Sequence, residues 1–193
     1  TTLRFDFSGI GDSDVRRDTL PFEESAPDEV VEAMDYLAER KGITRFALFG
    51  LCSGADVGFM AAVRDPRVVG LCSLDAWPYK TLRQKLHHYA PRVISPAAWR
   101  ASLKVRLERW RSRGAEPDTT DLELPTYVRT LPPRDWVAAR LRDLVARGVS
   151  LNYVFSGGQE EYNYATQFTD AFRDVDFADS LQLCHLRDAT HIF

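Results

Sequence analysis

The residues best suited to covalent chemistry lie at 50–54, where an apolar run passes into Gly-Leu-Cys-Ser-Gly and then into a helical pattern. A G-x-C-x-G spacing is typical of a nucleophile elbow, a strand-to-helix turn that strains its central residue. The positions two before and two after the centre must then be nearly free of side chain. Centring the turn on Ser53 would place Leu51 and Ala55 at those positions. Cys52 is therefore the candidate nucleophile; the alternative is a buried free cysteine that acts as a small hydrophobe.

The elements beside Cys52 would activate its thiol. The apolar run predicts a strand at Phe46–Phe49, and the pattern after the turn predicts a helix at Gly54–Arg64. The N-terminus of that helix would point free amides and its positive dipole end at Cys52. This arrangement favours the thiolate.

Composition limits the classes of protein to consider. The chain has 193 residues with 45% hydrophobic content, enough for one domain with a core. Its three cysteines, Cys52, Cys72 and Cys184, argue against a disulfide framework and for a reducing, cytoplasmic location. The net charge of −3 favours neither nucleic acid nor membrane, although residues 79–148 are basic. The chain contains no long apolar run, so stable membrane insertion is not expected.

Strand and helix patterns alternate along most of the chain, which predicts an α/β fold with a mostly parallel sheet and helices on both faces. A helix is expected from an N-cap at Ser25 to Gly42, and another at Tyr162–Phe172. The five expected strands are Leu3–Phe7, Phe46–Phe49, Val68–Leu74, Val149–Ser156 and Leu181–Leu186.

Four motifs together resemble the α/β-hydrolase fold. The elbow is the first of these motifs. The second is Thr1–Ser13, which resembles the strand and D-x-x-G-x-G-x-S turn that precede the elbow in that family. Residues 153–161 resemble the strand and G-x-x-D/E turn that carry the acid, and residues 188–193 resemble the turn of the catalytic histidine. The order nucleophile, acid, histidine is the family's order. Within the family, the elbow and the Ser-Gly-Gly-x-Glu-Glu-Tyr segment look most like the serine-aminopeptidase-like hydrolases encoded beside exosortase systems.

The resemblance implies which carboxylate is the acid. Counted from Gly157, the family's G-x-x-D/E spacing gives Glu160. Glu161 is the next residue, and Asp75 follows the preceding strand, so both remain alternatives.

The same resemblance implies covalent catalysis on a small-molecule ester or thioester. His191 would take the thiol proton of Cys52 while Glu160 holds the imidazole, and the thiolate would form an acyl-enzyme. The amide of Ser53 would be one donor of the oxyanion hole. No cofactor is implied.

No metal site is predicted. Asp6, Asp12 and Asp14 lack the glycine and terminal glutamate of a calcium loop. Residues 87 and 88 are both histidines, but no cysteine or carboxylate cluster lies near them in the sequence to complete a metal site.

Residues 77–148 interrupt the strand and helix alternation. An arginine-rich helix there carries an apolar stripe with Trp99 and Trp110, and a second amphipathic helix is expected after Pro133. In the family, an insertion at this point is a helical cap, which would bring Trp99 and Trp110 to the substrate. Docking of these helices to a membrane surface or a partner is the competing interpretation. The expected division is a core of 1–76 and 149–193 with a cap of 77–148.

The chain departs from the family in its number of strands. The early strands, the loop with the second oxyanion donor and the last helix are not found, so we expect a fragment of a longer protein. Losing one donor typically lowers the rate about 100- to 1000-fold. A non-catalytic binding module for an anionic glycan or a protein partner is therefore a second hypothesis, and acyl transfer to another acceptor is a third. The sequence does not determine the oligomeric state.

We expect Trp99→Ala and Trp110→Ala to change the preference for ester chain length more than the melting temperature, because cap side chains contact substrate and not the core. Kinetics with acyl esters of different lengths, beside thermal melts, measure both effects. A large loss of stability with unchanged preference would place these side chains in the core.

Overall fold

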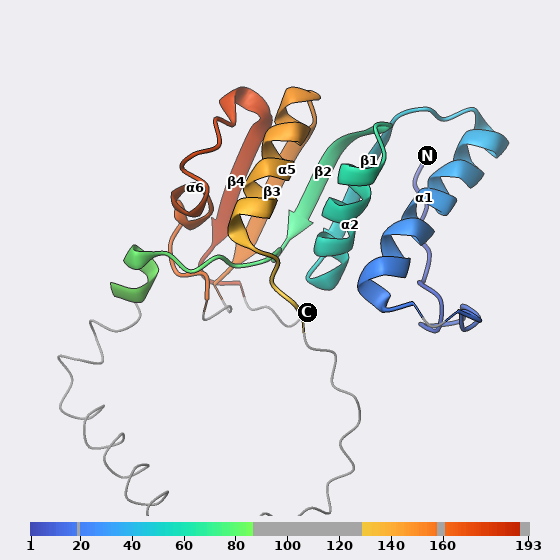
Figure 1. The fold of residues 1–193 in the computed structure, drawn as a ribbon, viewed down its shortest axis with the longest axis horizontal. Helices are drawn as coiled ribbons and strands as arrows, with labels where there is room; N and C mark the ends of the chain where they lie inside the picture. The colour runs from blue at the N-terminus through green and yellow to red at the C-terminus, as the bar shows by residue number, and fades with distance from the viewer. Residues whose placement is uncertain (19, 87–128, 158–160, 190–193) are drawn as a thin grey trace, which may run out of the picture.

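The computed structural model describes residues 1–18, 20–86, 129–157 and 161–189. Within them, four strands form one sheet in the order β1-β2-β3-β4 (Figure 1). Each strand pairs in parallel with the next, so all four carboxyl ends lie at one edge. The strands are β1 (Phe46–Leu51), β2 (Val68–Leu74), β3 (Ser150–Ser156) and β4 (Leu181–Leu186).

Helices follow the strands along the chain and complete the α/β fold that the sequence predicts. None of the helices in the described ranges is long and apolar enough to cross a membrane. The helices are α1 (Phe22–Lys41), α2 (Ser53–Arg64), α5 (Arg134–Ala146) and α6 (Gln167–Ala171), with a 3-10 turn η1 (Ala178–Ser180).

Helix α1 ends where the sequence predicts but begins earlier. Gly42 adopts a left-handed φ of 67°, and its amide donates to the carbonyl of Ala38 at 2.9 Å. The predicted N-cap at Ser25 is wrong, because the helix starts at Phe22 and Ser25 is buried within it. Pro27 lies inside the helix, where it has no N–H to donate to the carbonyl of Glu23 one turn earlier.

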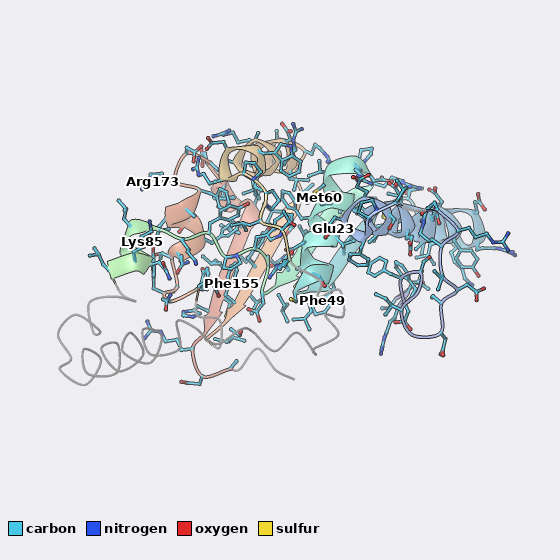
Figure 2. The ribbon with its side chains drawn as sticks, turned by 60° about the horizontal axis from the view of Figure 1, so that its bottom comes forward. Glu23, Phe49, Met60, Lys85, Phe155 and Arg173 are labelled. Carbon is cyan, nitrogen blue, oxygen red and sulfur yellow. The ribbon has the colours of Figure 1, made fainter. Side chains whose placement is uncertain are left out.

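The core lies between one face of the sheet and the helices. Leu71, Leu151 and Phe155 point from successive strands toward this layer and are at most 1% exposed. Figure 1 shows α2 over β1 and β2, and α5 over β3. On the opposite face Phe49 is 72% exposed, and Figure 2 shows it on the side of the strands away from α5. We expected helices on both faces of the sheet. Within the described residues, helices cover one face.

Helix α5 belongs to this core layer. Its apolar stripe, Val137, Ala138, Leu141 and Leu144, is at most 3% exposed and packs in the same cluster as the strands. We expected this amphipathic helix to belong to the cap, but its apolar stripe covers the sheet. The rest of the cap remains a prediction, since most of it lies outside the described residues.

The predicted first strand at Leu3–Phe7 is also wrong. The segment forms no strand, and Leu3 and Phe5 are about two-fifths exposed, at 41% and 39%. It lies against α1 instead: Phe7 contacts the ring of Phe22 edge-on at 5.5 Å, and the next amide donates to Glu29. No described strand pairs with it, and an unpaired strand leaves its backbone donors and acceptors unsatisfied.

Candidate active site

Cys52 lies at the turn between β1 and α2 with strained backbone angles. Its φ is 53° and its ψ is −119°, a region that residues with a Cβ rarely adopt. Such a conformation costs on the order of 1–3 kcal/mol and persists where the surrounding structure enforces it. The Cys52 amide donates to the carbonyl of Leu74 at 2.8 Å, which ties the turn to β2. The turn is therefore centred on Cys52, as the sequence predicts, and not on Ser53.

Only one of the two glycines around Cys52 is sterically required by the described residues. A Cβ at Gly50 would lie 2.6 Å from the amide nitrogen of Ala55 and closer still to the carbonyl of Gly54. A Cβ at Gly54 would meet no described atom within 4 Å. The expectation that both positions must lack a side chain is thus correct at Gly50 and wrong at Gly54. The reason is that β1 runs directly beneath the first turn of α2, whereas no described residue approaches the Cβ position of Gly54.

The backbone at the start of α2 is arranged to receive negative charge. Cys52 is half-buried, and its carbonyl accepts from the amides of Ala55 and Asp56 at 3.0 and 3.3 Å. Within the described part of the chain the Ser53 amide donates no hydrogen bond. A free amide at the N-terminus of a 12-residue helix suits an oxyanion donor.

Asp75 lies beside Cys52 at the end of β2, and its carboxylate is directed to β3. It is 2% exposed and has a left-handed φ of 49°. Its two oxygens accept from the amide of Ser156 at 2.7 Å and from the Ser156 hydroxyl at 2.8 Å. Asp75 therefore links the ends of two neighbouring strands.

The predicted acid Glu160 and base His191 both lie outside the described residues. The segments that lead to them do meet: the Gly157 amide donates to the carbonyl of Leu186 at 2.8 Å, and a Cβ at Gly157 would collide with the backbone of Arg187. The ends of β3 and β4 are thus held together just before both residues. The alternative acid Glu161 is exposed.

A second histidine is packed, as predicted. His185 lies on β4, and its ring meets that of Tyr162 edge-on at 5.3 Å. Both ring nitrogens are buried with no hydrogen-bond partner among the described residues. Burial lowers the pKa of His185, and Arg187 lowers it further.

An ion pair at the start of α2 was not predicted from the sequence. Arg129 donates to both carboxylate oxygens of Asp56, from Nε at 2.5 Å and from Nη2 at 2.6 Å. Asp56 lies in the first turn of α2 and is 6% exposed. The two residues are 73 positions apart, and no local pattern connects them.

A buried glutamine, also missed, orders the loop after β3. Gln167 is 1% exposed, and its amide donates to the carbonyls of Tyr79 and Glu161 at 3.0 and 2.5 Å. Its oxygen accepts from the amide of Asn163 at 2.8 Å. One side chain therefore joins the loop expected to carry the acid to the segment after β2. A glutamine at a helix start gives no signal of this in the sequence.

The predicted substrate contacts Trp99 and Trp110 lie outside the described residues. Among the residues that the structure does place, no group of three or more His, Cys, Asp or Glu side chains could hold a metal ion.

Comparisons with known proteins identify the architecture. No family model and no curated protein matches the sequence. Solved structures do match, among them a carboxylesterase of the thaumarchaeon Nitrososphaera gargenis, at 12% identity over 96% of this chain and 71% of that one, with a TM-score of 0.48. A mutant of the meta-cleavage product hydrolase CumD from Pseudomonas fluorescens IP01, complexed with acetates, also matches. The identity is 15% over 95% of this chain and 70% of that one, with a TM-score of 0.50. This chain has the α/β-hydrolase fold.

A third α/β-hydrolase structure, VinJ, matches at 16% identity over 88% of this chain and 68% of that one, with a TM-score of 0.41. At these identities the likeness concerns the fold alone.

We expect Gly50→Ala to destabilise the chain and Gly54→Ala to leave it as stable or slightly more so. A methyl group at Gly50 enters occupied backbone space, and overpacking of this kind costs about 1–3 kcal/mol or more. Alanine inside a helix is favoured over glycine by up to about 1 kcal/mol. Denaturant unfolding of both variants measures the difference. Equal losses at the two positions would contradict the steric account of the elbow.

Proposed function

We propose that this chain is an acyl hydrolase for small-molecule esters or thioesters, with Cys52 as its nucleophile. The strained backbone of Cys52 is the observation that supports this most directly. A non-glycine residue at φ 53° persists because Gly50 lets α2 lie against β1. The α/β-hydrolase fold presents a nucleophile at this turn, and Cys52 occupies it.

In the proposed reaction, His191 takes the proton of the Cys52 thiol, and Glu160 fixes the imidazole tautomer. The thiolate attacks the acyl carbonyl, and the oxyanion is held by the Ser53 amide. The bond to the leaving alcohol or thiol breaks, and His191 returns the proton to that leaving group. Water, deprotonated by His191, then cleaves the acyl-enzyme to a carboxylic acid and regenerates the thiol.

The three thiols differ in environment in the way the proposal requires. Cys52 is half-buried at the N-terminus of α2. Burial raises the pKa of Cys72, and Cys184 is exposed on β4. All three are free, which fits the proposed reducing compartment.

The proposal extends to the segment between β2 and Arg129. We propose that this insertion is the cap and that Trp99 and Trp110 on it contact the acyl group. Membership of the serine-aminopeptidase-like group is part of the same proposal, on the motifs quoted above.

We expect the chain to release p-nitrophenol from a short acyl p-nitrophenyl ester, and Cys52→Ala to abolish that turnover. The control is Cys184→Ala, which removes a thiol from the exposed strand face and should keep the wild-type rate. Turnover that survives in Cys52→Ala would rule out the proposed nucleophile. No turnover in the wild-type chain, with a folded protein by circular dichroism, would favour a binding module.

We expect Glu160→Gln to lower kcat at least about tenfold, because losing the acid in a serine-protease triad costs about 10^4. Glu161→Gln and Asp75→Asn should stay within a few-fold of wild type. Asparagine at position 75 can still accept from the Ser156 amide and can donate to its hydroxyl, so this variant should fold. Steady-state kinetics on all three variants decide the assignment. A larger loss in Glu161→Gln or Asp75→Asn would identify that residue as the acid.

A further inference from the structure

The segment after β2 enters a short helix whose apolar side chains face solvent. This helix covers residues 82–86 within the described part of the chain. Leu82 is 76% exposed and Leu86 is 68% exposed, which makes them two of the four most exposed large apolar side chains that the structure describes. Gln84, between them, is only 4% exposed. At about 100° per residue the two leucines lie opposite Gln84, so the helix turns a polar residue inward and an apolar stripe outward.

Contacts with the rest of the fold hold the helix in this orientation. Thr81 caps its N-terminus: the Thr81 hydroxyl accepts from the amide of Gln84 at 3.0 Å and lies 2.7 Å from the hydroxyl of Tyr164. The Arg83 guanidinium lies over the Tyr164 ring, 4.7 Å from its centre. Figure 1 shows the helix beside α6, at the opposite end of the described fold from α1. A rotation that buried the leucines would break the cap and move Arg83 off the ring.

Cations flank the exposed leucines. On the helix, Arg83 and Lys85 lie on opposite sides of the apolar stripe, and Lys80 precedes the cap; all three are exposed. Arg83 lies 3.8 Å from the carboxylate of Asp170, yet its side chain is 60% exposed. The sequence stays basic after this helix, since residues 80–113 hold ten Lys and Arg side chains against one glutamate in a chain of net charge −3. Positive charge and exposed apolar surface therefore coincide at this helix.

We propose that the surface formed by residues 80–86 docks on a bilayer that contains anionic phospholipids. The two leucines enter the boundary between headgroups and acyl chains, and the three cations contact lipid phosphates. The leucine stripe favours this partner over an anionic glycan or a nucleic acid, because a soluble polyanion attracts the cations but offers no apolar phase to the leucines. Docking of this kind is peripheral and needs no spanning helix. The inference does not depend on the proposed catalysis, since vesicle binding is measured without turnover.

Sedimentation of the full chain with vesicles tests the proposal. We expect binding to vesicles of phosphatidylcholine and phosphatidylglycerol to be at least about tenfold stronger than binding to vesicles of phosphatidylcholine alone. Leu82→Ser combined with Leu86→Ser should lower the partition coefficient on the anionic vesicles at least about tenfold, because two leucine side chains no longer leave water. Lys80→Gln combined with Lys85→Gln should lower it at least about fivefold, because two cations near the anionic surface are lost.

The matched control removes two exposed apolar side chains that lie near carboxylates. Ile10 and Leu20 are each 49% exposed; Ile10 is two residues from Asp12 in the sequence, and the Leu20 amide donates to Asp18 at 3.4 Å. Ile10→Ser combined with Leu20→Ser should leave the partition coefficient unchanged. Circular dichroism checks that each variant is folded, which we expect because all of the substituted side chains are exposed.

Three results would overturn the proposal: no binding of the wild-type chain to anionic vesicles, equal binding to both kinds of vesicle, or an equal loss in the Ile10 and Leu20 control. A leucine variant that binds like wild type, beside a lysine variant that does not, would reject the bilayer and indicate a site for a soluble polyanion. Ester turnover that persists in Cys52→Ala would instead reject the proposed function while the vesicle measurements stand.

Discussion

The close approach of β1 to the first turn of α2 is the constraint on which the site depends. At Gly50 the two backbones leave no room for a Cβ, and the chain can reverse there only if Cys52 takes a left-handed φ. The strain is stored locally and is offset by the burial of α2 and β1 in a common core. The same geometry puts the thiol at the N-terminus of a helix, where a negative charge is stabilised.

Parallel pairing carries this constraint across the sheet. Because all four strands end at one edge, Cys52, Asp75, Ser156 and Arg187 follow one another from β1 to β4. Polar contacts join neighbours along the edge: the Cys52 amide to β2, Asp75 to Ser156, and Gly157 to the end of β4. The edge is therefore one hydrogen-bonded unit on which the loops of the proposed triad begin.

Two polar side chains bind the ends of the long insertion to this edge. Arg129, at its return, is held by the elbow, and Gln167 joins the segment after β2 to the loop after β3. Both are buried or half-buried and multiply bonded, so removing either would leave polar groups unsatisfied. Through Arg129, the residue at which the described chain resumes is held by the same turn that carries the proposed nucleophile.

Local rules determined the elbow, the strands β2 and β4, and the end of α1 at Gly42. Each of these depends on neighbours a few residues apart: a glycine spacing, a continuous apolar run, or a left-handed cap. Tertiary structure alone decided three other features. Residues 3–7 have the pattern of a strand but no described partner strand, the amphipathic stripe of α5 covers the sheet and not the elbow, and Asp56 pairs with an arginine 73 positions away. A hydrophobic stripe indicates that a helix is buried, but not which surface it covers. A charged side chain in the core indicates that it has a partner, but not which residue that partner is. Those choices are made only when distant segments pack together.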